Sequence, residues 1–206
     1  VYNSLYDLHR LGIDTWVTDI YKLLVEFKLT DLWSDESLKI NIKEHIHDNY
    51  LDEWHKIMTS ETLYPVMRSY RIFKKTFVPE LYLKIRNFST RKAICKFRVS
   101  SHKLEIETGR YTKPRKMPVC DRLCRVCTIG DIEDEIHFLV QCPAFNDERK
   151  VLYEKLGWIN DSHQQLDKAE IFDRLLNLHS ESQLTNLGTY IINCFAKRES
   201  SLTSSQ

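Results

Sequence analysis

The chain has few residues that break helices, with five glycines and five prolines among 206 residues. No alternation of apolar and polar residues is sustained between turn dipeptides, which argues against a β-sandwich or β-barrel. No apolar run approaches the roughly 18 residues that a membrane span needs, and the N-terminus lacks the basic-then-apolar layout of a secretory signal. With 42% apolar and 29% charged residues, the composition predicts an ordinary soluble, intracellular protein of one or two domains that contacts no membrane.

Groups that would indicate catalysis are also missing. The sequence contains no glycine-rich phosphate loop, and no serine or cysteine nucleophile accompanied by a recognisable base. We therefore expect no catalytic residues in this chain. Its first residue is Val1 rather than methionine, which favours a fragment of a longer open reading frame.

Apolar residues recur at helical spacing over most of the chain, and we interpret these stripes as core packing. The expected N-terminal stripes are Trp16, Ile20, Leu23, Leu24 and Phe27 after an N-cap at Asp14, and Leu38, Ile42, Ile46, Tyr50, Trp54 and Ile57 after an N-cap at Ser34. Pro65 and Pro79 suit the first turns of two shorter helices.

The C-terminal part repeats this pattern. Asp167 and Glu170 resemble a capping box, and the stripe Leu184, Leu187, Ile191 and Phe195 predicts a last helix. We expect an N-terminal helical region over 1–88, a basic helix with a zinc-binding module over 89–158, C-terminal helices over 159–198 and a frayed tail over 199–206. The fold class is mainly α, a helical domain with a small Cys₃His zinc knuckle inserted between helices.

Four of the six cysteines fall within 23 residues, and a histidine lies among them. The spacing Cys124-x₂-Cys127-x₉-His137-x₄-Cys142 is that of a tetrahedral zinc site, in which a tight turn supplies two thiolates and a second element supplies the other ligands. On a continuous helix, His137 and Cys142 would point about 140° apart. Because Pro143 pushes Cys142 out of the helical region, the two side chains can still converge.

Three alternatives to zinc remain open for this cluster: a disulfide, a redox Cys-x-x-Cys motif and a chance grouping of buried thiols. Cys120 is an alternative ligand, whereas Cys95 and Cys194 are expected to be core thiols. The site would carry a net charge of −1, which Arg122 and Arg125 are placed to offset. Glu133, Asp134 and Glu135 are expected to favour the N-terminus of the short helix that carries His137.

These residues also carry a family resemblance. Arg122-Leu-Cys-x-x-Cys127, followed by Glu133-Asp-Glu-Ile-His-Phe-Leu-x-x-Cys-Pro143, resembles the zinc-binding region at the C-terminal end of non-LTR retrotransposon reverse transcriptases. The upstream stretch from Phe97 to Tyr111 is similar to the segment that precedes this motif. The resemblance covers residues 10–158 and is strongest over 97–145. It implies a partner within the same open reading frame, the upstream polymerase domain, and a place in a nuclear or cytoplasmic ribonucleoprotein.

Polymerase chemistry is not part of this resemblance. The aromatic-x-Asp-Asp motif that holds catalytic Mg²⁺ in reverse transcriptases is absent from the chain. With four protein ligands the zinc would be structural, and a catalytic zinc would need an open coordination position.

Charge is distributed very unevenly, although the formal net charge is +1. Residues 68–125 hold 17 lysines and arginines against 4 acidic residues, and both flanks are acidic. Such a band is either a polyanion-binding face or a solvated face that meets acidic neighbours after folding. A helix expected over about 91–104 would place Lys92, Lys96 and Lys103 on one side.

We therefore predict binding of RNA or DNA through this band. The candidate contacts are Lys92, Lys96, Arg98, Lys103, Arg110, Tyr111, Lys113, Arg115, Lys116, Arg122 and Arg125. The cations would neutralise phosphates and Tyr111 would stack on an unpaired base. The alternative function is a zinc-stapled protein-interaction module, either domesticated by a host or docking to the polymerase.

Overall fold

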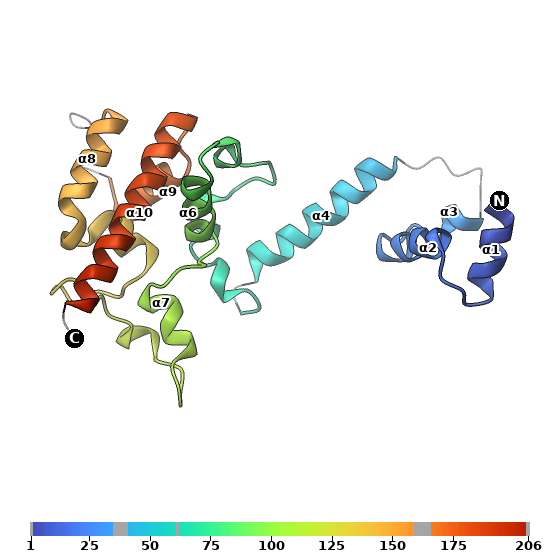
Figure 1. Cartoon of the computed structure of the whole chain (residues 1–206), viewed down its shortest axis with the longest axis horizontal. Helices are drawn as coiled ribbons and strands as arrows, with labels where there is room; N and C mark the ends of the chain where they lie inside the picture. The colour runs from blue at the N-terminus through green and yellow to red at the C-terminus, as the bar shows by residue number, and fades with distance from the viewer. Residues whose placement is uncertain (1, 35–40, 61, 159–165, 205–206) are drawn as a thin grey trace. The chain divides into compact units, whose positions relative to one another are not determined.

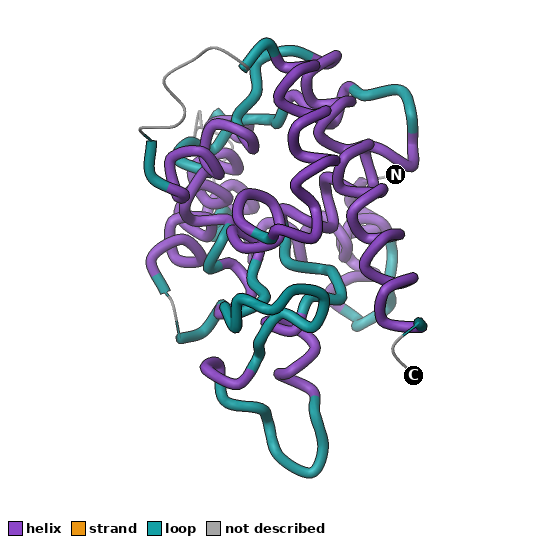
Figure 2. Tube along the Cα trace, turned by 90° about the vertical axis from the view of Figure 1, so that its left-hand side faces the viewer, coloured by secondary structure: helices purple, strands orange, loops and turns teal. Residues whose placement is uncertain are grey.

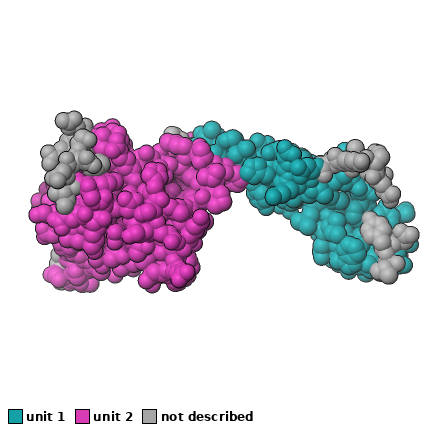
Figure 3. Space-filling view, turned by 90° about the horizontal axis from the view of Figure 1, so that it is seen from above, with its two compact units in different colours: residues 1–59 teal, residues 60–206 magenta. Residues whose placement is uncertain are grey.

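A computed structural model describes residues 2–34, 41–60, 62–158 and 166–204. The chain divides into two compact units, residues 1–59 and 60–206, which Figure 3 shows in two colours. The described residues form helices and loops, and the only β-type pairing among them is an isolated antiparallel bridge between Leu123 and Ile132. The protein is therefore mainly α, as the sequence predicts. Over the same residues, no helix has both the length and the apolar character needed to cross a membrane.

The described residues of the first unit form four helices: α1 (Tyr2–Arg10), α2 (Trp16–Glu26), α3 (Asp31–Ser34) and α4 (Ile42–Thr59) (Figure 1). Its small interior includes Val17 and Leu29, and the rings of Tyr21 and Trp33 meet edge to face. The N-cap of α2 is Thr15 rather than the expected Asp14.

The interpretation of the N-terminal stripes as core is wrong for most of their residues. Trp16, Ile20 and Leu23 are all exposed on α2, and α4 buries none of its side chains. The few helices of this unit offer too little surface to cover both stripes. Ser34 ends α3 instead of capping the next helix. The predicted stripe position Leu38 lies outside the described residues.

The second unit is built around two long helices that pack on each other. These are α6 (Phe88–Arg98), which Asn87 caps by accepting a hydrogen bond from the Thr90 N–H, and α10 (Glu181–Thr203), which Ser180 caps. Around them lie α5 (Tyr70–Phe73), α7 (Glu105–Thr108), α8 (Asn146–Leu156), α9 (Lys168–Leu176) and short 3₁₀ turns at Pro65–Met67, Leu81–Lys84, Gly109–Tyr111, Val119–Asp121 and Pro143–Phe145.

Close packing of α6 on α10 depends on a glycine. A Cβ atom at Gly188 would lie 2.4 Å from the Thr90 side chain and 3.1 Å from that of Ile94. With no side chain in the way, Ile94 and Phe97 of α6 are buried in the same core as Leu187 and Ile191 of α10. The predicted stripe of the last helix is confirmed, since Leu184, Leu187 and Ile191 are buried and Phe195 packs against the core. Asp167 is the N-cap of α9, as predicted, and Pro65 occupies a first-turn position, although of a three-residue 3₁₀ turn.

The boundaries differ from those expected in three places. The structure divides the chain at 59/60 rather than 88/89, because Phe73, Tyr82 and Ile85 belong to the core of the second unit. The helices after residue 166 are part of that core and form no separate domain. The 199–203 segment continues α10 and is not frayed. In addition, α6 ends at Arg98, and Pro79 precedes the Glu80 N-cap of its 3₁₀ turn.

Candidate metal centre

The first half of the centre is a turn closed by backbone hydrogen bonds. The Cys124 N–H donates to the Asp131 carbonyl at 2.9 Å, and the Glu133 N–H donates to the Arg122 carbonyl at 2.8 Å. Gly130 within the turn has a φ of +80°, which is unfavourable for residues with a Cβ atom. This closed turn carries Cys124 and Cys127.

The second half is a single π-helical turn, His137–Gln141. Asp134 begins it by accepting a hydrogen bond from the His137 N–H at 2.8 Å. The Cys142 N–H donates to the His137 carbonyl at 2.7 Å, an i→i+5 bond that brings the two residues together. Cys142 has φ −55° and ψ 120°, so its backbone leaves the helical region before Pro143, as the sequence predicts.

The four predicted ligands converge. Their ligand atoms all lie within 4.8 Å of one another, and the group can hold a metal ion. The Sγ atoms of Cys124 and Cys142 are 3.9 Å apart, and Cys127 Sγ lies 3.5 Å from His137 Nε2. Cys142 and His137 are almost fully buried, whereas Cys127 is half-buried.

The pKa values of Cys124, Cys127 and His137 are raised at this centre, whereas the hydrogen bond with Cys124 lowers the pKa of Cys142. The hydrogen bond with the Cys142 sulfur, together with burial, raises the pKa of Cys124 to about 12. Burial would lower the pKa of His137, but the hydrogen bond with Cys124 and the negative charges around the ring raise it. Since metal ligands must be deprotonated, metal binding here would release protons.

The other ring nitrogen of His137 faces a carboxylate. His137 Nδ1 lies 3.6 Å from Asp131 Oδ2, longer than a hydrogen bond, and is buried without a hydrogen-bond partner among the described residues. A metal ion on Nε2 would place the ring proton on Nδ1, toward Asp131, and a carboxylate there orients a ligating imidazole.

The acidic residues before His137 do more than favour a helix N-terminus. Only Asp134 has that role, whereas Glu133 and Glu135 are fully buried acceptors. Glu133 binds Arg198 of α10 through two hydrogen bonds of 2.7 and 2.6 Å, and its Oε1 lies 3.8 Å from Cys124 Sγ.

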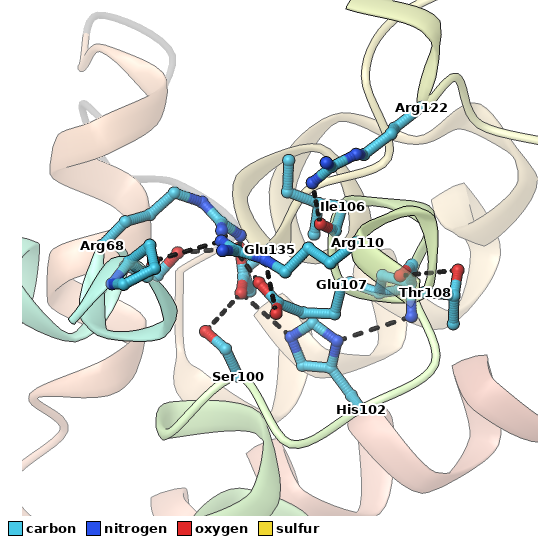
Figure 4. A network of polar contacts seen from close by, with 12 residues as sticks. Arg68, Ser100, His102, Ile106, Glu107, Thr108, Arg110, Arg122 and Glu135 are labelled. Atoms are coloured by element: carbon cyan, nitrogen blue, oxygen red, sulfur yellow. Dashed lines mark hydrogen bonds and ion pairs between the residues drawn. The ribbon is translucent and has the colours of Figure 1, made fainter. Parts of the chain in front are cut away.

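Glu135 is the centre of a second network, drawn in Figure 4. Ser69 and Ser100 each donate to it at 2.7 Å, His102 contacts it at 3.0 Å and Arg68 forms an ion pair with it. Burial would raise the pKa of Glu135, but the His102 contact and the Arg68 charge lower it strongly. The segment that carries His137 is thus held from several sides.

Sequence reasoning missed two arginines that support the centre. Arg149 of α8 donates to the carbonyls of Leu139 at 3.1 Å and Cys142 at 2.8 Å, and Arg198 holds Glu133. Both arginines lie within helical patterns in the sequence, where their spacing suggests exposed positions, so no local signal identifies them.

Of the remaining cysteines, Cys95 and Cys194 belong to the core as expected, whereas the alternative ligand Cys120 is not among the grouped residues. Cys120 is exposed and lies outside the four-residue group, where its thiol donates to Asp121 at 3.5 Å. Cys194 is buried, and burial raises its pKa to about 12. Cys95 packs against the core.

Most of the predicted nucleic-acid contacts are exposed. This group comprises Lys92, Lys96, Lys103, Tyr111, Lys113, Arg115, Lys116 and Arg125. We call residues 111–116 the basic loop; it begins at the last residue of the Gly109–Tyr111 turn, after α7, and projects from the second unit (Figures 1 and 2). Within the described part of the chain, no acidic side chain pairs with Lys113, Arg115 or Lys116. Lys103 and Arg125 are paired, with Glu199 at 3.1 Å and Glu105 at 3.4 Å.

Three predicted contacts have partners inside the fold. Arg98 is 4% exposed and pairs with Glu80, so its assignment as a phosphate contact is wrong. Arg122 is buried as well, and its guanidinium binds carbonyl oxygens. Arg110 is half-buried and pairs with Glu107 at 2.9 Å. Because these three side chains are buried or half-buried in the fold, they contribute little to an exposed phosphate-binding face.

Arg122 instead closes the base of the basic loop. Its Nε and Nη2 donate to the Met117 carbonyl at 3.0 and 2.7 Å, and its Nη1 donates to the Ile106 carbonyl at 2.7 Å. The Met117 N–H donates to the Gly109 carbonyl at 2.9 Å. A Cβ atom at Gly109 would lie 2.8 Å from Arg122, so this glycine makes room for the guanidinium. The expected role of Arg122 and Arg125 as charges that offset the thiolates is not supported by these contacts.

Comparison of the chain with protein-family models, with curated proteins and with solved structures finds no match.

Proposed function

We propose that the chain is a zinc-stabilised, non-catalytic region of a retroelement reverse transcriptase that binds element RNA or target DNA. The observation that carries the proposal is the basic loop, where Lys113, Arg115 and Lys116 are exposed without acidic partners among the described residues. Charges that the fold has not already paired remain available for phosphates. Tyr111, with 76% of its surface exposed, adds a ring on which an unpaired base can stack.

Zinc is the metal ion that the donor set favours. In a tetrahedral zinc site with Zn–S bonds of about 2.3 Å, neighbouring sulfurs lie about 3.8 Å apart, and sulfur and nitrogen about 3.5 Å apart. The corresponding distances here are 3.9 Å between Cys124 and Cys142 and 3.5 Å between Cys127 and His137. Four protein ligands leave no position for water, which supports a structural role.

The metal centre and the basic loop are linked through one residue. Arg122 closes the loop at Met117 and lies two positions before Cys124. A zinc ion that orders the turn beginning at Cys124 would therefore also fix the base of the loop. Through this connection the metal ion would support nucleic-acid binding indirectly, without contacting the nucleic acid.

Binding to labelled single-stranded RNA and DNA at several salt concentrations tests the proposal. Each phosphate contact to a single strand contributes about −0.7 to the log–log salt slope, so charge reversal of Lys113, Arg115 and Lys116 to Glu should remove about two units of slope. Reversal of the exposed Lys150, Lys155 and Lys168 provides a control with the same change in net charge. Equal losses in both triple variants would contradict the assignment to the basic loop.

A second function is favoured by the exposed apolar face of α2. Trp16 and Leu23 are each 52% exposed and Ile20 is 41% exposed, on one side of the helix. This face fits a role of the first unit in docking to the polymerase domain of the same open reading frame. Replacement of Ile20 and Leu23 by Ser should weaken association with that domain in a pull-down while leaving RNA binding unchanged.

A further inference from the structure

A cavity of about 350 Å³ lies in the second unit, and its lining residues include neither the metal-ligand group nor the basic loop. Its walls are the connection after α5, the end of α6 and the link between α9 and α10, and we call it the Lys74–Arg98 cavity after two of its lining residues. Its size falls in the range of small-molecule sites.

Two positive charges are buried in its wall. Lys74 is 7% exposed and Arg98 is 4% exposed. Both pair with Glu80, which lies 3.3 Å from the Lys74 ammonium and forms an ion pair with Arg98. Within the described part of the chain, Glu80 is the only carboxylate that contacts Lys74 or Arg98. The buried wall therefore has one positive charge in excess.

Arg198 is an informative comparison, because it is buried to the same 4%. It contacts two carboxylates, Glu133 in a bidentate pair and Glu105 at 3.5 Å. Burial would lower the pKa of Arg198, but these carboxylates raise it. Burial lowers the pKa of Arg98, and the shared Glu80 does not compensate. Arg198 thus has two carboxylates of its own, whereas Arg98 shares a single carboxylate with Lys74.

Both cations have donors left for such a charge. An ammonium has three N–H donors and a guanidinium has five. The Lys74 ammonium donates to the Val78 carbonyl at 2.6 Å and pairs with Glu80. The Arg98 guanidinium donates to the Leu176 carbonyl and pairs with Glu80. The Arg98 guanidinium also lies 4.1 Å from the centre of the Phe73 ring, which keeps it in a fixed orientation.

We propose that the Lys74–Arg98 cavity binds a small oxyanion, a carboxylate or phosphate group, carried on a short apolar body. The anionic group completes the charge balance of Lys74, Arg98 and Glu80, since an uncompensated buried charge is costly. The apolar body packs against Leu81, Leu178 and Leu184, which line the same cavity. Lys75 and His179, also in the lining, are exposed and add a positive potential at the entrance when protonated.

Calorimetric titration of the full chain at constant ionic strength in a chloride buffer tests this proposal. The probes are phenyl phosphate, benzoate and inorganic phosphate. We expect phenyl phosphate or benzoate to bind at least tenfold more tightly than inorganic phosphate, because only the former two fill the apolar part. Whichever of phenyl phosphate and benzoate binds more tightly shows whether the cavity prefers a phosphate or a carboxylate group. Absence of heat and of a thermal shift with all three probes would overturn the proposal.

Two charge variants with opposite expected effects make the test specific. Lys74→Met removes the excess charge and should weaken binding at least tenfold, whereas Glu80→Gln increases the excess and should strengthen it. Lys84→Met, an exposed residue outside the lining, is the matched control and should leave affinity unchanged. Circular dichroism checks that each variant folds. If Lys74→Met does not fold, Glu80→Gln decides, and unchanged or weaker binding in that variant overturns the proposal.

Discussion

Glu133 and Arg198 form a fully buried bidentate ion pair between the segment that carries His137 and the helix α10. The two residues are 65 positions apart, and the two hydrogen bonds measure 2.7 and 2.6 Å. Glu133 also accepts a hydrogen bond from the Glu105 N–H at 2.8 Å. The pair thereby connects the metal centre, α7 and the last helix of the chain.

Removal of one partner of this pair should be costly. We expect Arg198→Met to lower the free energy of unfolding by about 3–5 kcal/mol, because Glu133 would stay buried without its counter-charge. The double variant with Glu133→Gln should lose less than the sum of the single changes. Urea unfolding measures these values. Arg174→Met is the control, because its ion pair with Glu170 is nearly half exposed and should contribute no more than about 1 kcal/mol. A similar loss of stability in Arg174→Met and Arg198→Met would argue against the buried pair.

Metal removal should unfold the centre. Structural zinc contributes an apparent ~10–16 kcal/mol in small modules, so we expect one zinc per chain and loss of both zinc and local structure in Cys124→Ser. Metal analysis and circular dichroism measure the two effects. Cys120→Ser is the control, because that thiol is exposed and outside the ligand group. Loss of zinc in Cys120→Ser, or full zinc content in Cys124→Ser, would show that the ligand set is wrong.

The closure of the basic loop by Arg122 can be tested by limited proteolysis. Arg122→Lys replaces the two-pronged contact with the Met117 carbonyl by a single ammonium, so the loop should open more often. We expect trypsin to cleave after Arg115 and Lys116 severalfold faster, with zinc content unchanged. Arg125→Lys, an exposed neighbour, should cleave at the original rate. Equal cleavage rates in both variants would mean that Arg122 does not close the loop.

The close approach of α6 and α10 predicts that Gly188 tolerates no side chain. A Cβ atom there would lie 2.4 Å from the Thr90 side chain and 3.0 Å from the Thr90 carbonyl. Forcing the helices apart should cost about 1–3 kcal/mol in Gly188→Ala, measured by urea unfolding. Asn193→Ala, at an exposed position on the same helix, should change stability by about 0.5 kcal/mol or less. Wild-type stability in Gly188→Ala would refute this packing.

Local spacing is sufficient to predict the ligand group. Cys124 and Cys127 are separated by two residues, and Pro143 releases the Cys142 backbone from the helix, so both halves of the centre form from short-range preferences. The N-cap at Asp167 and the first-turn position of Pro65 also depend only on neighbouring residues. The spacing does not predict the i→i+5 turn at His137, because π turns have no simple residue signature.

The exposure and partners of charged side chains are predicted less well, because a sequence does not show which charged residues lie close together in the fold. Its basic band places Arg98 and Arg122 on a phosphate-binding face, yet Glu80 holds the first and the Met117 carbonyl accepts hydrogen bonds from the second. These partners are 18 and 5 residues away along the chain, and no spacing rule connects them to the arginines. Glu133 and Glu135, expected at a helix N-terminus, are buried among arginine, serine and histidine donors.

The sequence by itself determined the helical class, the metal-ligand spacing and the stripe that buries α10, since each follows from the spacing of residues within one short stretch of the chain. Only the tertiary structure decided which apolar stripes are covered and which cations remain exposed. Burial depends on the neighbours that a segment meets in space: Leu187 meets α6, whereas Leu23 stays half exposed. Lys113 remains exposed for the same reason, because the loop that carries it projects from the fold.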